Sequence, residues 1–337
     1  MWIVSRLIPF LKLYMIGLKV LLYQLWNRSF ALPVLAKQNG KVAVVTGGTK
    51  GIGYETVRQL VNLGMFVIIA SHDEEEGLSA VRKLREENSE AQVDFEYLDV
   101  SSLKSVRRFV QRFKDRDLPL HVLINNAGVM LVPEGRTEDG FETHFATNYL
   151  GHFLLTRLLL ETLMHSGKDE SYSRVINVSS SAHYTADLHL QDLQNTQCYS
   201  AHAAYACSKL AQVLFTYHLH YKLQSIRAPL TVNAVDPGVV NTDLYSHVNH
   251  LIRYALKPIA RLFFKTPADG AVTGVYAAVS SDLESVSGCY LYEGECIESS
   301  LNSYDEDLQT GLWQKTCDLL NLRHSLYEDW THDDITK

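Results

Sequence analysis

The sequence contains few cysteines, and none of them forms a C-x-x-C pair. Their number is odd, and they all lie in the C-terminal half, at positions 198, 207, 289, 296 and 317. Such a distribution indicates neither a disulfide framework nor a zinc site, so we expect free thiols in a reducing compartment. The histidines also lack the spacing of metal ligands, and no metal site is predicted.

An excess of basic charge is missing as well. The formal net charge is -7, and nucleic-acid binding needs clustered lysines and arginines, so nucleic acid is not an expected partner. The acidity belongs to the body of the chain, because residues 1–40 contain no carboxylate and the first acidic residue is Glu55. The N-terminus is therefore a basic, apolar arm.

The arm also lacks a long uncharged run. A spanning helix needs about 20 nearly uncharged residues, but Arg6, Lys12 and Lys19 interrupt residues 2–26. The two lysines lie seven positions apart and share a helix face, from which they can reach lipid headgroups. We expect residues 1–39 to be a membrane-associating arm, as a surface helix or as a hairpin bent at Pro9 and Gly17. A cleaved signal peptide and a helix packed on the protein's own body stay open as alternatives.

From position 40 onward, short apolar runs alternate with helical segments, without internal repeats or a low-complexity linker. This alternation predicts an α/β fold with a doubly wound (Rossmann) parallel sheet of seven strands in a single domain. The domain is expected to span residues 40–295, followed by a short helical C-terminal tail over 296–337. The predicted strands are 42–45, 66–70, 93–98, 122–125, 175–178, 230–235 and 288–292.

A glycine-rich turn, T-G-G-T-K-G-I-G at positions 46–53, follows the first predicted strand directly. Gly47 allows the tight turn, and Gly51 lets the backbone approach a pyrophosphate at the N-terminus of the next helix. Gly53 allows the helix to pack closely on the strand. Because the turn stands between the first strand and a helix, it predicts a dinucleotide-binding site.

The residues at the end of the second strand decide between NAD and NADP, because they contact the 2′ position of the ribose. Ser71 and His72 stand where the discriminating contact is expected, and Asp73 comes slightly late for a carboxylate that binds the ribose of NAD. Lys50, beside the glycine turn, can pair with the 2′-phosphate of NADP. We therefore predict that both NAD and NADP are used; alternatively, His72 and Asp73 only cap the next helix.

Four polar groups are predicted to meet at the carboxyl edge of the sheet. Tyr205 and Lys209 lie four positions apart on one helix face. The ammonium and an oxidised nicotinamide favour the phenolate, so Tyr205 can act as general base in oxidation and general acid in reduction. The serine run 179–181 ends a strand, and Asn148 can hold a water for proton relay. The D-P-G segment at 236–238 also reaches this crevice.

The set T-G-x-x-x-G-x-G, Asp99, N-N-A-G, Asn148, serine, Y-x-x-x-K and P-G, in this order, resembles the short-chain dehydrogenase/reductase family over about residues 40–295. The resemblance implies a catalytic tetrad of Asn148, Ser180, Tyr205 and Lys209. It also implies an NAD(P)(H)-dependent alcohol dehydrogenase or carbonyl reductase.

The same resemblance implies the residues that hold the cofactor. Asp99 would contact the adenine, Asn125 would fix the cofactor, and Thr242 would meet the nicotinamide carboxamide. His72 stands where retinol dehydrogenases usually carry arginine, which argues against strict use of NADP. The full predicted set is Gly47, Thr49, Lys50, Gly51, Ile52, Gly53, Ser71, His72, Asp99, Val100, Asn125, Ala127, Tyr205, Lys209, Pro237, Gly238 and Thr242.

The stretches H-V-L-I-N-N-A-G-V-M, N-Y-L-G-H-F-L-L-T and V-D-P-G-V-V-N-T-D are similar to a branch of the family that acts on long-chain isoprenoids. This likeness implies oxidation of polyprenol to polyprenal with NAD and reduction of dolichal to dolichol with NADPH, in dolichol synthesis for protein N-glycosylation. It implies a lipid alcohol or aldehyde as partner. We also expect a homodimer and, from the apolar, basic arm, a place at the endoplasmic reticulum membrane surface or a lipid droplet. The catalytic domain would then lie in the cytosol; secretion is the alternative.

Residues 251–265 combine large apolar side chains with a basic residue at every fourth position, from Arg253 to Lys265. The family resemblance implies that this region covers the substrate pocket, and an apolar, cationic lid would suit a lipid and an anionic surface. The alternative is a solvated surface helix bent at Pro258. Two other functions stay open. One is a retinol or steroid dehydrogenase, and the other is a catalytically vestigial nucleotide-sensing or secreted signalling protein.

Overall fold

A computed structural model describes residues 2–27, 29–194, 199–247 and 260–326. The sheet has the strand order β3-β2-β1-β4-β5-β6-β7-β8, and its neighbours from β3 to β7 pair in parallel. The predicted doubly wound α/β fold is confirmed. The strands are β1 (Val42–Thr46), β2 (Phe66–Ser71), β3 (Val93–Tyr97), β4 (Val122–Asn125), β5 (Ser173–Val178), β6 (Leu230–Asp236), β7 (Tyr290–Tyr292) and β8 (Glu295–Ile297).

The sheet has eight strands rather than the predicted seven. The additional strand, β8, pairs antiparallel with β7. It is only three residues long, too short for alternation to be visible in the sequence. The available sequence signal was the Glu293-Gly294 pair between the two strands. In the structure both residues have positive φ, as a tight two-residue hairpin requires. β8 also straddles the predicted end of the domain at position 295.

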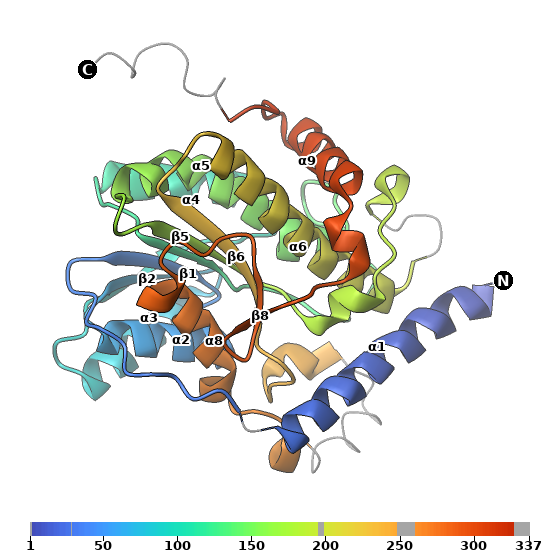
Figure 1. Cartoon of the computed structure of the whole chain (residues 1–337), viewed down its shortest axis with the longest axis horizontal. Coiled ribbons are helices and arrows are strands. Elements are labelled where there is room, and N and C mark those ends of the chain that lie inside the picture. The colour runs from blue at the N-terminus through green and yellow to red at the C-terminus, as the bar shows by residue number, and fades with distance from the viewer. Residues whose placement is uncertain (1, 28, 195–198, 248–259, 327–337) are drawn as a thin grey trace.

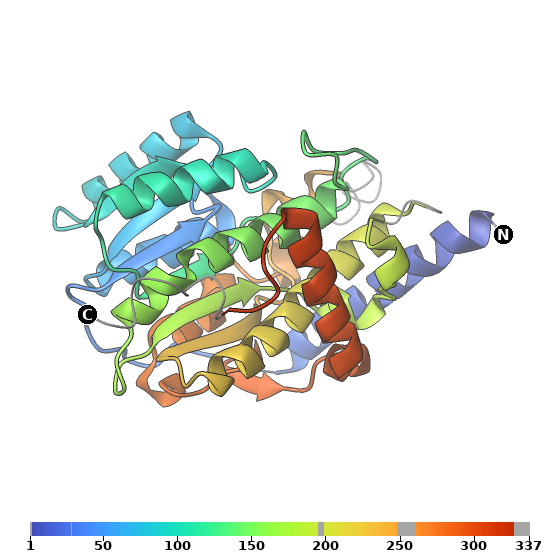
Figure 2. The same cartoon turned by 90° about the horizontal axis from the view of Figure 1, so that it is seen from above.

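Helices cover both faces of the sheet (Figures 1 and 2). One face carries α2 (Gly51–Asn62), α3 (Glu74–Glu87) and α8 (Pro267–Val279); the other carries α4 (Leu103–Asp115), α5 (Gly151–Ser166) and α6 (Ala201–Ser225). Outside α5 and α6 lies α9 (Glu306–Leu320), the helical part of the predicted tail. The short helices are η1 (Phe145–Leu150), η2 (Ser181–Thr185), η3 (Leu190–Asp192), η4 (Asp243–His247), η5 (Ser281–Leu283) and η6 (Leu301–Tyr304).

The core explains why the strands read as unbroken apolar runs. Every residue of β1, β4, β5 and β6 is buried, because helices cover both sides of a parallel sheet. Side chains of α9 extend the core beyond the sheet: the Trp313 ring lies 5.0 Å from that of Phe153. The tail is therefore packed into the domain rather than appended to it.

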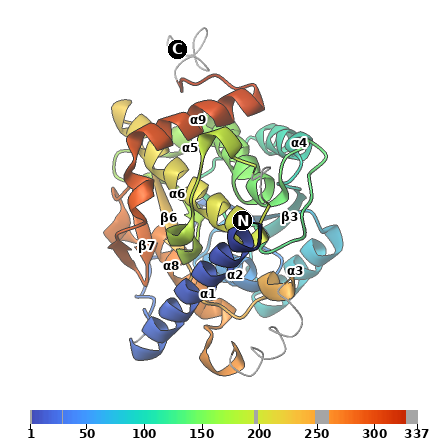
Figure 3. The ribbon, with the colours of Figure 1, turned by 90° about the vertical axis from the view of Figure 1, so that its right-hand side faces the viewer.

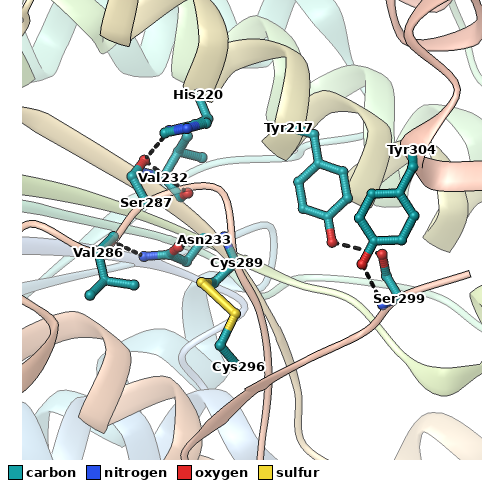
Figure 4. The surroundings of a disulfide bond; sticks show 10 residues. All are labelled: Tyr217, His220, Val232, Asn233, Val286, Ser287, Cys289, Cys296, Ser299 and Tyr304. Atoms are coloured by element: carbon teal, nitrogen blue, oxygen red, sulfur yellow. Dashed lines mark hydrogen bonds between the residues drawn. A yellow bond between two sulfur atoms is a disulfide. The ribbon is translucent and has the colours of Figure 1, made fainter.

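The expectation of free thiols is wrong for Cys289 and Cys296, which form a disulfide across the β7–β8 hairpin (Figure 4). Their Cα atoms lie 5.7 Å apart, within the usual range for a disulfide. Counting cysteines did not reveal the pair because the hairpin, not sequence spacing alone, brings the two together. Cys207 and Cys317 are buried and take no part in this disulfide, whereas position 198 lies outside the described residues.

The N-terminal arm is one helix, α1 (Trp2–Trp26), that continues through Pro9. The hairpin alternative is therefore wrong. α1 lies against η2 and the N-terminal part of α6 (Figure 3). Within the described residues it is the one helix long and apolar enough to span a membrane by length and composition. Most of the predicted lid lies outside the described residues; positions 260–263 are helical.

Candidate active site

The glycine turn joins β1 to α2 at the carboxyl edge of the sheet. Gly47 and Gly51 have φ angles of +66° and +57°, which L side chains adopt only with strain. A Cβ on Gly53 would lie 2.2 Å from the Gly47 carbonyl oxygen, so helix and turn touch as predicted. Beside the turn, the Thr242 methyl would lie 3.4 Å from a Cβ on Gly51. The loop after β6 therefore reaches the glycine turn.

The N-N-A-G segment supports the turn through contacts with Thr46 and Asn126, which sequence reasoning did not single out. Thr46 Oγ1 accepts hydrogen bonds from the backbone N–H groups of Asn126 and Ala127, both at 2.9 Å. Asn126 Nδ2 donates to the Thr46 carbonyl oxygen at 2.8 Å. The predicted Asn125 is fully buried and donates to Thr156 and Asn177, which ties β4 to α5 and β5. Its side chain is thus directed into the core.

The residues for the adenosine end lie at the ends of β2 and β3. Ser71 is buried, His72 is exposed, and Asp73 caps α3 by accepting from the Glu76 N–H at 2.9 Å. The capping alternative therefore holds for Asp73. Lys50 forms an ion pair with Glu76 at 3.1 Å, and Thr49 donates to the same carboxylate at 3.3 Å. Glu76 was not predicted, although its place in the first turn of α3 puts it beside the glycine turn.

Asp99 and Val100 follow β3. Asp99 Oδ1 accepts from the backbone N–H and the hydroxyl of Ser101, at 2.9 Å and 2.7 Å. Val100 is buried, and its carbonyl oxygen would lie 1.9 Å from a Cβ on Gly151 at the start of α5. These contacts hold the end of β3 against α5 at the same edge as the glycine turn.

Tyr205 and Lys209 lie near the start of α6, and both are buried, with 4% and 5% of their surface exposed. Lys209 Nζ lies 5.9 Å from the centre of the Tyr205 ring and donates to the Val178 carbonyl oxygen at 2.8 Å. Burial raises the pKa of Tyr205 to about 12, and a hydrogen bond with the Ser180 side chain opposes this rise. Burial lowers the pKa of Lys209 to about 7. The structure thus brings three of the predicted catalytic residues together.

Asn148 reaches the same place from η1, a π-helical segment that continues into α5. Such segments are frequent at functional sites. Its Oδ1 accepts from the Val129 N–H at 2.8 Å, and its Nδ2 donates to Ser208 Oγ at 2.9 Å. A Cβ on Gly128 would lie 3.1 Å from Asn148 Oδ1 and 3.8 Å from Lys209 Nζ. Both side chains therefore border the same glycine.

Asp236, at the end of β6, is the principal charged group that sequence reasoning left without a role. It is 3% exposed, and its Oδ2 accepts from the Tyr290 hydroxyl at 2.8 Å. Its Oδ1 accepts from the Gly238 N–H at 2.8 Å, which shapes the P-G loop. Its negative charge raises the pKa of Lys209 and works against its neutralisation by burial. A carboxylate that directly ends a buried strand was the available signal.

A small apolar cluster includes the side chain of Tyr205. It consists of Met130, Ala182 and Tyr205, with Leu13, Leu131, Leu244 and Tyr245 packed against it. Tyr245 belongs to η4, soon after Thr242, whereas Leu13 belongs to α1. The N-terminal helix therefore contributes to the surroundings of the catalytic tyrosine, which the sequence did not indicate.

These residues fit a nicotinamide dinucleotide. The N-terminus of α2 has no side-chain cap, so its first-turn N–H groups can serve an anionic ligand. The glycine turn keeps side chains out of that approach, and a phenol, an ammonium and a hydroxyl converge further along the same edge. Such an arrangement can hold a diphosphate and transfer a proton next to a reacting carbon.

Comparison with known proteins agrees with this geometry. The sequence model described as short chain dehydrogenase matches residues 41–251. Polyprenol dehydrogenase of Danio rerio is 57% identical over 324 residues, which cover 96% of this chain and 100% of the relative. Polyprenol dehydrogenase of Homo sapiens is 51% identical, with coverage of 92% and 94%. Retinol dehydrogenase 11 of Mus musculus is 40% identical, with coverage of 84% and 87%.

Solved structures show the same fold. An uncharacterised protein from Mycobacterium paratuberculosis matches with a TM-score of 0.69 and 33% identity, covering 86% of this chain and 97% of the other. The RhlG/NADP active-site complex of Pseudomonas aeruginosa matches with a TM-score of 0.61 and 23% identity, covering 76% and 95%. At that identity the second likeness supports the fold alone.

Proposed function

We propose, from the premise that this chain belongs to the short chain dehydrogenase family, that it interconverts a long-chain isoprenoid alcohol and its aldehyde. The chain is an NAD(P)-dependent oxidoreductase that acts on CH–OH groups. The substrate is polyprenol in oxidation with NAD and dolichal in reduction with NADPH, as steps of dolichol synthesis. The observation that carries this proposal is the identity of 57% and 51% to two polyprenol dehydrogenases over nearly the whole chain.

The cofactor, when bound, supplies the hydride acceptor in oxidation and the hydride in reduction. In oxidation Tyr205 takes the proton of the substrate hydroxyl, and in reduction it returns a proton to the carbonyl oxygen. Ser180, which bonds the Tyr205 side chain, holds the substrate oxygen beside it. In its protonated form Lys209, whose Nζ lies 5.9 Å from the centre of the Tyr205 ring, would favour the phenolate, because a nearby positive charge stabilises it. Asn148 holds a water for proton relay to Lys209 across Gly128.

The test of this function uses the purified full chain with polyprenol and NAD, or with dolichal and NADPH, and follows the nicotinamide absorbance. Tyr205→Phe removes the proton donor and acceptor, so the rate is expected to fall by about 10²–10⁴-fold in both directions. Turnover of retinal but not of dolichal would reject the isoprenoid and favour a retinol dehydrogenase. Equal rescue of deficient cells by Tyr205→Phe and by the unchanged protein would favour a vestigial, non-catalytic function.

Use of both NAD and NADP is part of the proposal. The exposed His72 leaves space for the 2′-phosphate of NADP, and the positive charge of Lys50 would attract it. The negative charge of Glu76 beside Lys50 instead favours NAD, whose ribose carries no phosphate there. Titrating the protein with NADH or NADPH and following the nicotinamide fluorescence measures the two affinities. A difference of about 10³-fold or more would contradict dual use.

The proposed lid spans residues 251–265, and its described part, residues 260–265, supports a place over the substrate. The Phe264 ring lies 5.7 Å from the Tyr245 ring, which packs on the catalytic cluster. A homodimer also stays part of the proposal, and light scattering of the full chain in detergent tests it.

We place the protein at the endoplasmic reticulum membrane or a lipid droplet, with the catalytic domain in the cytosol. The apolar helix α1 is compatible with membrane association, and nothing in the relatives supports secretion. The Cys289–Cys296 disulfide favours an oxidising compartment, so the side of the membrane is best decided by protease treatment of intact microsomes. Digestion of the domain supports the cytosol, and protection places it in the lumen.

A further inference from the structure

α1 has two apolar faces. Its inner face, which includes Leu13 and Tyr14, is partly buried against the body. Its outer face is exposed, although most of its side chains are apolar: Leu7 49%, Leu11 48%, Met15 70%, Leu18 57%, Leu22 56% and Trp26 90%. A helix that only packed on its own protein would present polar side chains to water. The second apolar face therefore needs an explanation of its own.

The inner face touches the surroundings of the catalytic tyrosine. Leu13 packs on the cluster that contains Tyr205 and Ala182. Further along the helix, the rings of Phe10 and Tyr14 lie 5.2 Å and 6.0 Å from that of His202, one turn before Tyr205 on α6. These contacts place α1 directly beside the predicted catalytic tyrosine.

The C-terminal end of α1 touches the loop after β6. Gln24 Oε1 accepts from the Val239 N–H at 3.3 Å, and a Cβ on Gly238 would lie 2.4 Å from Gln24 Nε2. Gln24 Nε2 is itself buried without a protein partner. The helix thus meets both sides of the predicted site, the catalytic cluster and the P-G loop.

The outer face suits an anionic lipid surface. Lys12 and Lys19 are exposed at the edge of this face, and no carboxylate precedes Glu55, although the net charge of the chain is -7. A basic helix on an acidic body is complementary to anionic headgroups rather than to a second copy of the body. The exposed Tyr23 and Trp26 are side chains typical of the membrane–water interface.

We propose that α1 is a shared wall: its inner face lines the substrate site and its outer face lies in the lipid surface. The isoprenoid chain then passes from the lipid along α1 to Tyr205 without crossing water. This inference rests on the proposed lipid substrate, but the position of α1 has tests that do not.

The first test compares matched leucines on the full chain: Leu13→Arg on the inner face, Leu18→Arg on the outer face and Leu78→Arg on the exposed side of α3. Binding to phosphatidylcholine–phosphatidylserine vesicles and the KM for prenol, a water-soluble isoprenoid alcohol, are measured separately. Leu13→Arg is expected to raise the KM by about tenfold while vesicle binding is kept. Leu18→Arg is expected to lower vesicle affinity by about tenfold, and Leu78→Arg should change neither.

Two results overturn the proposal. One is an unchanged KM in Leu13→Arg and in the milder Leu13→Ala, which would remove α1 from the site. The other is wild-type protein that does not bind vesicles but self-associates through Leu18, which would assign the outer face to a second copy. Oxidation of prenol but not of polyprenol in vesicles would instead reject the proposed function and leave the wall in place.

A second test does not depend on activity. Among the described residues the cysteines are buried or disulfide-bonded. Cys198 lies outside the described residues and is first replaced by serine, so that a new surface thiol can be labelled selectively. Leu18→Cys is expected to react with a maleimide about tenfold faster than Leu13→Cys, and vesicles should slow only the Leu18→Cys reaction. Equal rates at both positions would show that α1 does not pack on the body.

Discussion

At the residue scale, two carboxylates from separate elements meet lysines of the predicted site. Asp236, at the end of β6, raises the pKa of Lys209, and Glu76, on α3, forms an ion pair with Lys50. Each carboxylate therefore changes the charge that its lysine presents to a ligand. The spacing of four residues on one helix predicted that Tyr205 and Lys209 lie side by side, whereas the fold alone brings each carboxylate to its lysine.

The pair of Lys50 and Glu76 makes a prediction about the cofactor. Glu76→Gln removes the negative charge beside Lys50, with which it pairs at 3.1 Å, so a 2′-phosphate is repelled less and Lys50 is free to bind it. The ratio of kcat/KM with NADPH to that with NADH is expected to rise by about threefold to tenfold at low salt. Both side chains are partly exposed, so the rise should shrink at high salt.

Glu75→Gln is the matched control, because this exposed carboxylate lies in the same first turn of α3. If Glu75→Gln changes the cofactor ratio as much as Glu76→Gln does, the effect is one of general charge and the pair with Lys50 does not select the cofactor.

Lys209 makes a prediction about stability and pH. Burial lowers its pKa from 10.5 to about 7 in the folded protein. Between these values the unfolded chain binds a proton that the folded chain has released, so the free energy of unfolding rises with pH across this window. Below about pH 7 both states are protonated and this contribution is constant.

Urea unfolding at about pH 6.5 and pH 9 measures the effect, and Lys209→Met is the comparison that lacks the titrating group. The gain in stability on raising the pH should be larger in the unchanged protein than in Lys209→Met. An identical gain would show that Lys209 keeps an ordinary pKa. Tyr205 does not interfere, since its raised pKa of about 12 lies above this range.

At the scale of the elements, the length of a strand decided whether it could be predicted from the sequence. β1 and β6 are buried runs of five and seven residues, and both were found. β8 has three residues, too few for a period of two to stand out from chance. The same strand carries Cys296, so the missed strand and the missed disulfide have one cause, the unrecognised Glu293-Gly294 turn.

The disulfide predicts a loss of stability on its removal. The bond closes a loop with a sequence separation of 7, so replacing Cys289 and Cys296 by serine should lower the free energy of unfolding by about 2 kcal/mol. Thermal unfolding with and without reductant measures this. Reductant should lower the Tm of the unchanged protein and leave the double variant unaffected. Alkylation of both cysteines in the denatured, unreduced protein would contradict the bond.

At the scale of the whole molecule, the sequence divides the chain into arm, domain and tail, but in the structure the arm and the tail both pack on the domain. α1 reaches the catalytic cluster through Leu13, and α9 reaches the core through Trp313. Composition marked residues 1–39 as different, and the end of the strand pattern marked 296–337. Neither signal reports which surface a segment covers, because that depends on the apolar faces that the rest of the chain leaves open.

The packing of α9 leads to a prediction that separates stability from catalysis. Trp313 is 2% exposed and its ring lies between those of Phe153 and His218, both at 5.0 Å. Trp313→Ala should lower the free energy of unfolding by about 3–5 kcal/mol, because it removes a buried aromatic side chain and leaves a cavity. Since Trp313 contacts α6 well beyond Tyr205, kcat/KM below the melting temperature should stay within about twofold.

Gln314→Ala, an exposed position on the same helix, is the control and should alter the free energy of unfolding by less than about 0.5 kcal/mol. If Trp313→Ala were as stable as Gln314→Ala, α9 would be an appendage and the predicted boundary at position 295 would be a true domain border. A large loss of stability with unchanged catalysis instead makes the tail part of the cooperative unit. The helix that carries Tyr205 would then be held by core contacts on both sides, from the sheet and from α9.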